Sequence, residues 1–442
     1  MASAPGGRPF ARAAAWLAVL APFFYLSYGA ANWLAAQRMG VPVVVFGWER
    51  HIPFIAWTII PYWSVNLFYG ASLFVARTRA ELDTHGRRLL TAQVIAVACF
   101  LVAPLRFSFE KPDTGGGLPG FLFDALAGFD KPFNQAPSLH IALLVILWVL
   151  YARHLPRWLR PLLHVWFALI GVSVLTTYQH HFIDVPTGAL LGLACLWIWP
   201  DAAPSPFAAA ALTSDPRRHV LALRYLAGAA LFAALGLALG GAGLWLFWPA
   251  VALGLVAANY AYFGPAGFQK RADGRMSLAA RLLLAPYILA AFANSRLWTR
   301  RAPRPVAVSD GVYIGRFPAR SDRSPVWQQP FVAIVDLAAE LPAVRGAPVV
   351  AVPALDLVMP PPRLLRDAAI AIERVRAAGR GPVLVCCALG FSRSAAAAAT
   401  WLVRTGRVAD AHAAVKLLAA AGARVVLCDD TLIAVEEAAR LP

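Results

Sequence analysis

The long apolar runs of this chain constrain its fold more than any other feature. Runs such as 16–36, 52–76, 89–105 and 139–151 approach or reach the ~20 residues that a helix needs to cross a bilayer. Hydrophobic residues make up 60% of the 442 residues and charged residues 14%, which is too apolar for an ordinary soluble protein of this length. Because the apolar runs end near residue 300, we expect a membrane part followed by a soluble part.

The hydrophobicity pattern predicts an all-α polytopic membrane domain over residues 1–265, of about eight transmembrane helices. A basic interfacial helix with a linker follows over 266–303, and a soluble α/β domain occupies 304–442. The last two spans lie outside the core of the membrane domain, at 219–263. The predicted spans are near 13–36, 53–76, 89–106, 138–153, 158–179, 182–200, 219–239 and 244–263.

The distribution of basic residues predicts the orientation. Residues 1–301 carry 24 Lys and Arg against 11 Asp and Glu, and the arginines gather in alternate connections between spans. Such loops lie on the cytoplasmic side, so charge gives no reason to expect a nucleic-acid partner. We predict a multi-pass protein of a bacterial-type inner (plasma) membrane, with the N-terminus and the C-terminal domain in the cytoplasm. The apolar segment 277–298 is taken to lie on the membrane, since a ninth span would place the soluble domain outside.

Two short histidine-bearing stretches lie on the same predicted outer side of the membrane domain. One ends in Ser138 and His140, and the other contains His180 and Asp184. A carboxylate four residues after a histidine can fix the imidazole tautomer and stabilise the imidazolium, as a nucleophilic histidine requires. A second histidine can protonate a leaving oxygen. The pattern of His140, His180 and Asp184 on one side therefore indicates a site for nucleophilic and acid–base chemistry.

Cations in the long loop on that side indicate an anionic ligand. Arg106 and Lys111 depart from the preference for basic residues on the cytoplasmic side, and together with Ser138 they are candidate phosphate-binding residues. The alternative is that the histidines are interfacial polar residues that merely end spans. A transporter is a weaker alternative, because charged residues in the middle of the spans are scarce.

These residues resemble motifs of the type 2 phosphatidic acid phosphatase superfamily over about residues 50–200. Pro137-Ser-Leu-His140 is similar to its Pro-Ser-Gly-His motif, and His180-x-x-x-Asp184 is similar to its third motif. Val174 stands where that motif has arginine, after Ser173, which makes the domain similar to the inositol phosphorylceramide synthase branch. The resemblance implies His180 as the nucleophile that forms a phosphohistidine, Asp184 as its orienting partner and His140 as general acid. It leaves hydrolysis and head-group transfer as alternatives.

A second candidate site lies near the C-terminus, where a buried-strand pattern ends in Cys387 and an Ala-rich helix begins at about Ser394. A loop that closes on a helix N-terminus directs backbone N–H groups at one point and so binds anions. A cysteine there is a nucleophile near neutral pH, Arg393 can bind phosphate oxygens, and Ser394 can donate to the leaving thiolate. The predicted phosphate-binding loop consists of Ala388, Leu389, Gly390, Phe391 and Ser392.

Asp356, on a Pro-rich stretch upstream, is the predicted general acid. This set resembles the dual-specificity branch of the protein tyrosine phosphatases over about residues 305–440, with Cys386 in place of the histidine that precedes the nucleophile. Cys386 is interpreted as a small buried strand residue, with a role as resolving thiol as the alternative. The resemblance implies a phosphoric monoester hydrolase that works through a phosphocysteine.

We therefore expect a membrane-bound bifunctional phosphatase that acts on lipid phosphomonoesters or similar phosphoesters near the membrane. A phosphoprotein substrate and a catalytically silent phosphate-binding module are the alternatives for the C-terminal domain. No metal, cofactor or nucleic acid is expected. The five cysteines suggest no disulfide framework, which suits a reducing compartment.

Overall fold

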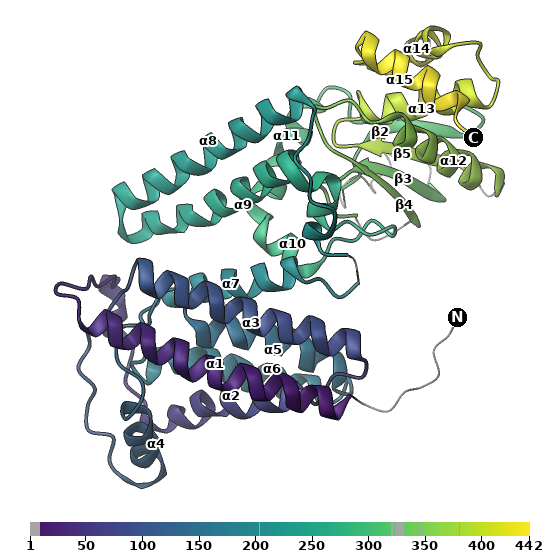
Figure 1. Cartoon of the computed structure of the whole chain (residues 1–442). Helices are drawn as coiled ribbons and strands as arrows, with labels where there is room; N and C mark the ends of the chain where they lie inside the picture. The colour runs from purple at the N-terminus through teal and green to yellow at the C-terminus, as the bar shows by residue number, and fades with distance from the viewer. Residues whose placement is uncertain (1–8, 203, 320–321, 323–330, 344–346, 380) are drawn as a thin grey trace. The chain divides into compact units, whose positions relative to one another are not determined.

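The computed structural model describes residues 9–202, 204–319, 322, 331–343, 347–379 and 381–442 (Figure 1). Contacts within the chain separate two compact units, Met1–Ser205 and Pro206–Pro442. The chain is mostly helical, and the second unit contains a five-stranded sheet. The sequence predicts a boundary near residue 265 instead. The two differ because the helices between 216 and 258 pack against the elements that follow them.

The first unit is a bundle of helices around α5 (Leu139–His154), which contacts α2, α3, α6 and α7. The close approach of α5 and α7 depends on glycine. A Cβ added to Gly188 would lie 2.4 Å from the carbonyl oxygen of Ser138, and one at Gly192 would lie 2.7 Å from that of Ala142. The other helices are α1 (Phe10–Ala36), α2 (Ile59–Ser72), α3 (Arg79–Val102), α4 (Gly117–Ala127), α6 (Arg160–Thr176) and α7 (Asp184–Ile198).

The structure has a helix at each of the eight predicted spans, but the helices differ in length. Among the described residues, four are long and apolar enough to cross a membrane: Phe10–Ala36, Arg79–Val102, Pro216–Leu239 and Gly241–Phe268. α5, α6 and α7 are shorter apolar helices. Membrane association is therefore indicated by length and composition, while eight crossings stay a prediction.

One end of the bundle of the first unit holds a network of ion pairs. Arg88 of α3 is 2.9 Å from Asp201, which follows α7, and Arg153 near the end of α5 also pairs with Asp201. Arg88 falls inside the helix, because α3 begins at Arg79, ten residues before the predicted span. Thr78 caps that start by accepting a hydrogen bond from the N–H of Glu81 at 3.2 Å. The early part of α3, the end of α5 and the chain after α7 thus lie at the same end of the bundle.

The second unit begins with an antiparallel hairpin of α8 (Pro216–Leu239) and α9 (Phe247–Ala258), which run side by side in Figure 1. Short helical turns continue α9 as far as Phe268. The predicted single helix at 277–298 is two helices, α10 (Leu278–Leu283) and α11 (Ala285–Trp298). Pro286 lies in the first turn of α11, where a missing N–H is tolerated but where a preceding helix cannot continue.

The sheet has the strand order β1-β2-β5-β3-β4. β1 pairs antiparallel with β2, and all other pairs are parallel. This arrangement places the carboxyl ends of β3, β4 and β5 at one edge. The strands are β1 (Val306–Ser309), β2 (Val312–Arg316), β3 (Ala333–Ala338), β4 (Val349–Ala354) and β5 (Val383–Cys387).

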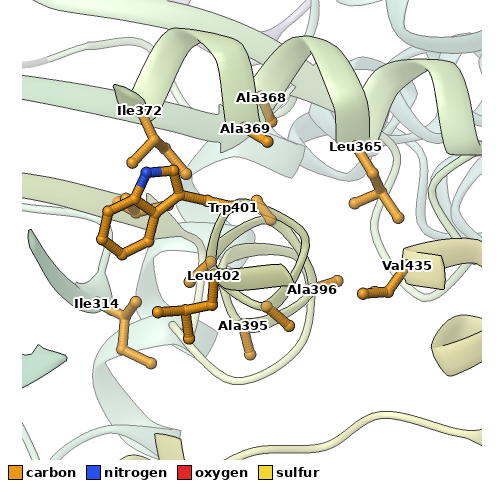
Figure 2. Packing of buried hydrophobic residues seen from close by; sticks show 14 of the residues in the cluster. Ile314, Leu365, Ala368, Ala369, Ile372, Ala395, Ala396, Trp401, Leu402 and Val435 are labelled. Carbon is orange, nitrogen blue, oxygen red and sulfur yellow. The ribbon is translucent and has the colours of Figure 1, made fainter. Parts of the chain in front are cut away.

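Both faces of the sheet are covered, which explains why every residue of β5 is buried. Val383, Val385 and Cys387 belong to a core formed with α12 (Pro362–Ala377), α13 (Arg393–Arg404), α14 (Ala411–Ala420) and α15 (Asp429–Arg440). Figure 2 shows part of this core, where Trp401 of α13 lies beside Ile372 of α12.

The opposite face carries Leu384 and Cys386, packed with Ile288, Ala291 and Phe292 of α11. The helix predicted to lie on the membrane surface therefore buries one side against the sheet. Its other side exposes large apolar residues, among them Leu289 at 68% and Trp298 at 60%.

Candidate functional site

The C-terminal site is a loop between β5 and α13 that surrounds the sulfur of Cys387. The backbone N–H of Gly390 donates to Cys387 Sγ at 3.2 Å, and Ser394 Oγ lies 3.4 Å from the same sulfur. Gly390 has a φ of +83°, and a Cβ there would lie 2.4 Å from the carbonyl carbon of Gly315. Glycine is therefore required for the turn. Of the remaining loop residues, Ala388 is buried, Leu389 and Phe391 are half-buried and Ser392 is exposed.

Arg393, the first residue of α13, is buried and held by two carboxylates. Its guanidinium donates to both oxygens of Glu340, at 2.9 and 2.7 Å, and to the carbonyl of Ala354 at 2.9 Å. Asp356 Oδ1 is 2.9 Å from Nη2. Burial disfavours the charged guanidinium, but Asp356 and Glu340 outweigh it and raise the pKa of Arg393 well above its usual value. A fixed positive charge thus lies at the site.

Asp356 follows β4 on the predicted Pro-rich loop, with a side chain that is 34% exposed. Burial raises the pKa of Asp356, the guanidinium of Arg393 opposes the shift, and Glu340 adds to it. A carboxyl group with a raised pKa keeps its proton to a higher pH, which suits a general acid. Glu340 is different. Burial raises its pKa, but Arg393 outweighs burial and the pKa of Glu340 is lowered.

Three side chains from the segment before the sheet reach the same site. The hydroxyl of Tyr260 donates to the carbonyl of Asp356 at 2.9 Å. Lys270 Nζ donates to Asp336 Oδ2 at 2.5 Å and to the carbonyls of Ala338 and Leu341. Ser295 Oγ donates to the carbonyl of Ala388 at 2.5 Å.

Sequence reasoning placed Cys387, Arg393, Ser394 and Asp356 in this site but missed Glu340 and the contacts from the linker. Glu340 follows β3, which neighbours β5 in the sheet, and a carboxylate just past a buried strand is a usable signal. The linker contacts had no comparable signal, because they join residues more than 60 positions apart.

In the first unit, His180 lies between two hydrogen-bond partners. Its Nδ1 is 3.1 Å from Asp184 Oδ2, and its Nε2 is 3.1 Å from Ser138 Oγ. The backbone N–H of Ser138 also donates to the carbonyl of Asp184 at 3.1 Å. The predicted nucleophile and its orienting carboxylate are therefore adjacent, and both are buried.

His140 lines the same small cavity as His180. The cavity has a volume of about 90 Å³ and is also lined by Tyr28, Tyr62 and Asp130. The ring of His140 stacks on that of Tyr62 at a centroid distance of 4.2 Å. Within the described residues, His140 Nε2 has no hydrogen-bond partner, so it is available to a ligand.

The predicted cations are not part of this cavity lining as far as the described residues define it. Arg106 and Lys111 are exposed, although Lys111 interacts electrostatically with Asp130. Val174, at the position of the motif's arginine, is buried in the apolar core. It contacts His180 through its carbonyl, which accepts the His180 N–H at 3.0 Å. The side chain at the arginine position of the motif is therefore part of the core, and the backbone of the same residue supports His180.

Asp130, Glu49 and His181 were not predicted for this end of the bundle. Glu49 Oε2 is 3.0 Å from His181 Nδ1 and accepts the N–H of Phe182 at 2.9 Å. These bonds hold the chain just after His180. Among the residues that the structure describes, no group of three or more His, Cys, Asp or Glu is arranged to hold a metal ion.

No protein-family model matches the chain. No curated protein matches it. Solved phosphatase structures do match about a third of it. "Tk-PTP in the active form" has 23% identity and a TM-score of 0.29, covering 32% of this chain and 99% of that one. PTPMT1 in complex with PI(5)P has 16% identity and a TM-score of 0.28, covering 31% and 94%. Human DUSP28 has 23% identity and a TM-score of 0.26, covering 31% and 95%.

Proposed function

We propose that this chain is a phosphoric monoester hydrolase whose nucleophile is Cys387. One observation carries the proposal: the Cys387 sulfur lies in a loop on a helix N-terminus, with the buried Arg393 beside it and Asp356 next to Arg393. Backbone N–H groups and a guanidinium together bind the three non-bridging oxygens of a phosphate group. Neutral-ester or redox chemistry would not need this buried cation.

The reaction has two steps. The thiolate of Cys387 attacks phosphorus, the S–P bond forms, and the bond to the leaving oxygen breaks as Asp356 gives that oxygen its proton. Water then attacks the phosphocysteine, Asp356 takes a proton from the water, and the S–P bond breaks to release phosphate. Ser394 donates a hydrogen bond to the departing thiolate.

We propose a lipid phosphomonoester as the substrate of this site. Tyr260, which donates to the carbonyl of Asp356, belongs to the candidate membrane helix Gly241–Phe268. A helix that crosses the bilayer would thus contact the loop of the general acid directly, and it would place that loop near the lipid head groups. A phosphoprotein is the alternative, and substrate preference separates the two.

The test is phosphate release by the purified full chain carrying His180→Ala, which silences the other candidate site, from phosphatidic acid, phosphatidylglycerol phosphate, a phosphoinositide and a phosphotyrosine peptide. Cys387→Ser should abolish release from whichever substrate this site uses. Cys386→Ala is the matched control, because the neighbouring thiol lies on the opposite face of the sheet, and it should keep most of the activity. Full activity in Cys387→Ser would overturn the assignment, and preference for the peptide would overturn the lipid substrate.

A second activity is proposed at His180, and it rests on two neighbouring cavities. The cavity that contains His140 and His180 shares lining residues with a second cavity of about 200 Å³. The second is mainly apolar and extends along α1 to Leu17, a length that suits an acyl chain beside a phosphate head group. The shared residues are Phe24, Tyr25, Val65, Asn66 and Leu143.

In this proposal His180 forms a phosphohistidine, Asp184 stabilises its imidazolium, and His140 protonates the leaving oxygen. Water gives hydrolysis, and an aligned alcohol gives head-group transfer. Both products are measured in a Cys387→Ser protein with a radiolabelled lipid and an added polyol. His180→Ala should remove the product, while the exposed His51→Ala should not. If both variants still form the product, the role of His180 is contradicted.

We propose that the N-terminus and the sheet-containing part of the second unit lie in the cytoplasm. The argument is the charge of the connections between predicted spans. Reporter fusions after residue 310 should behave as cytoplasmic and fusions near residue 120 as external. An external reporter after residue 310 would reverse the orientation and expose Cys387 to an oxidising space.

A further inference from the structure

The chain from the end of the last predicted span to the sheet, residues 260–303, contacts three parts of the Cys387 site. Tyr260 bonds the loop of Asp356, Lys270 bonds the segment that leads to Glu340, and Ser295 bonds the loop after Cys387. The general acid, the carboxylate that holds Arg393 and the phosphate-binding loop are therefore each attached to this segment.

The Tyr260 contact is the one that bears on chemistry. Its side chain is only 1% exposed, and its ring packs against Tyr225 at a centroid distance of 5.4 Å. The hydroxyl donates a hydrogen bond of 2.9 Å to the carbonyl of Asp356. A buried tyrosine fixed at its ring can hold the acceptor in one position.

The backbone that Tyr260 holds is strained. Leu357, which follows Asp356, has a φ of +59°, a conformation that costs a branched residue about 1–3 kcal/mol. Such a conformation persists only when its surroundings fix it. The hydrogen bond from Tyr260 is made to the peptide unit that joins Asp356 and Leu357, and so it acts on this strained point.

We propose that Tyr260 is a positioning residue that holds the Asp356 loop in place beside Arg393, so that a membrane-attached helix completes the active site. This inference rests on the proposed function. In this arrangement the phosphatase fold over 304–442 is not self-sufficient, since proton transfer to the leaving group depends on a hydroxyl at residue 260. Activity is thereby coupled to the attachment that brings the enzyme to its substrate.

The experiment compares the full-length wild type, Tyr260→Phe and Tyr262→Phe on two soluble esters, phenyl phosphate and 4-nitrophenyl phosphate. Phenolate is the more basic leaving group and depends more on a general acid. Tyr260→Phe keeps the ring and loses the hydroxyl. It should lower kcat/KM, which reports the steps up to formation of the phosphocysteine, by about tenfold for phenyl phosphate and much less for the nitrophenyl ester. Tyr262 is 48% exposed, and its variant should match the wild type on both esters.

The outcomes separate the two claims. An equal fold loss of kcat/KM on both esters would mean that Tyr260 has a merely structural role, and no loss on either ester would mean that its hydroxyl is not needed. Either result would overturn the positioning role. Cys387→Ser with full activity on both esters would instead overturn the proposed function. Asp356→Asn is the reference for complete loss of the general acid. Tyr260→Phe should change the ratio of kcat/KM for the two esters in the same direction as Asp356→Asn, by a smaller factor.

Discussion

The Cys387 site and the His180 site differ in how each obtains its positive charge. In the Cys387 site, Arg393 is 2% exposed and is locked by both oxygens of Glu340. In the His180 site the candidate cations are exposed, and the described lining of the cavity includes the carboxylate of Asp130 instead. In the first site the cation is thus fixed before any ligand arrives. In the second, the function that we propose requires a cation from the loop that contains Arg106 and Lys111.

The two sites also differ in how much of the sequence each one spans. The nucleophile, anion loop and arginine of the first site lie within one strand–loop–helix segment, 383–394. The second site is assembled from residues at and just before the starts of α5 and α7, and it depends on Gly188 for their close approach. A local motif predicts its own geometry, whereas an assembled site depends on packing that no short motif encodes.

The largest expected effect concerns stability. Lys270→Met leaves Asp336 buried without its cation, since both side chains are 0–1% exposed. Breaking such a pair costs about 3–5 kcal/mol, so the second unit should unfold at a markedly lower temperature. The neighbouring Arg271→Met, with a side chain that is 55% exposed, is the control and should behave as wild type.

Lys270→Met also sharpens the comparison between the sites. Thermal unfolding and ester hydrolysis at Cys387 should both suffer, while any lipid chemistry that depends on His180 should persist. Equal stability of Lys270→Met and Arg271→Met would mean that the linker is only a tether.

The next effect concerns the buried cation. Arg393→Lys keeps the charge but loses the planar fork that matches phosphate and Glu340. We expect kcat/KM for 4-nitrophenyl phosphate to fall by about 10²–10³-fold, the scale of losing one preorganised donor. The same exchange at the exposed Arg106 should have no effect on this ester. A fully active Arg393→Lys would remove the main distinction between the two sites.

A smaller effect concerns the general acid. Asp356→Asn should lower kcat for phenyl phosphate by about 10²-fold. The pKa of Asp356 is raised, chiefly by burial, and the protonated form is the active one. Activity should therefore fall as pH rises through that pKa in the wild type. The alkaline limb of the kcat profile should be absent in Asp356→Asn, and an unchanged limb would assign it to another group.

Some of the molecule followed from the sequence. Helices occur at every predicted span, and the buried β5 strand leads through a glycine turn to a helix at Arg393, as the pattern indicated. α3 starts earlier than the predicted span, because Thr78 caps a helix whose first turns are charged. Hydrophobicity alone reports where a helix is apolar and not where it begins.

The remaining errors arise from tertiary contacts. The segment 277–298 is apolar, and a sequence cannot say whether such a surface meets lipid or a sheet; Ile288 and Phe292 meet the sheet. Val174 occupies the arginine position of the motif, and the motif alone did not show that its side chain is buried in the core while its carbonyl accepts the His180 N–H. The face of the helix on which a residue lies decides what its side chain contacts, and a single motif position does not reveal that face.

The central claim is that turnover passes through a phosphocysteine on Cys387. It is tested most directly by rapid acid quench of the His180→Ala full chain during turnover of a ³²P-labelled aryl phosphate, followed by peptide mapping. We predict stoichiometric label on the peptide that contains Cys387, and none in a His180→Ala protein that also carries Cys387→Ser. Continued turnover with label absent from Cys387, or label on another residue, would contradict the account.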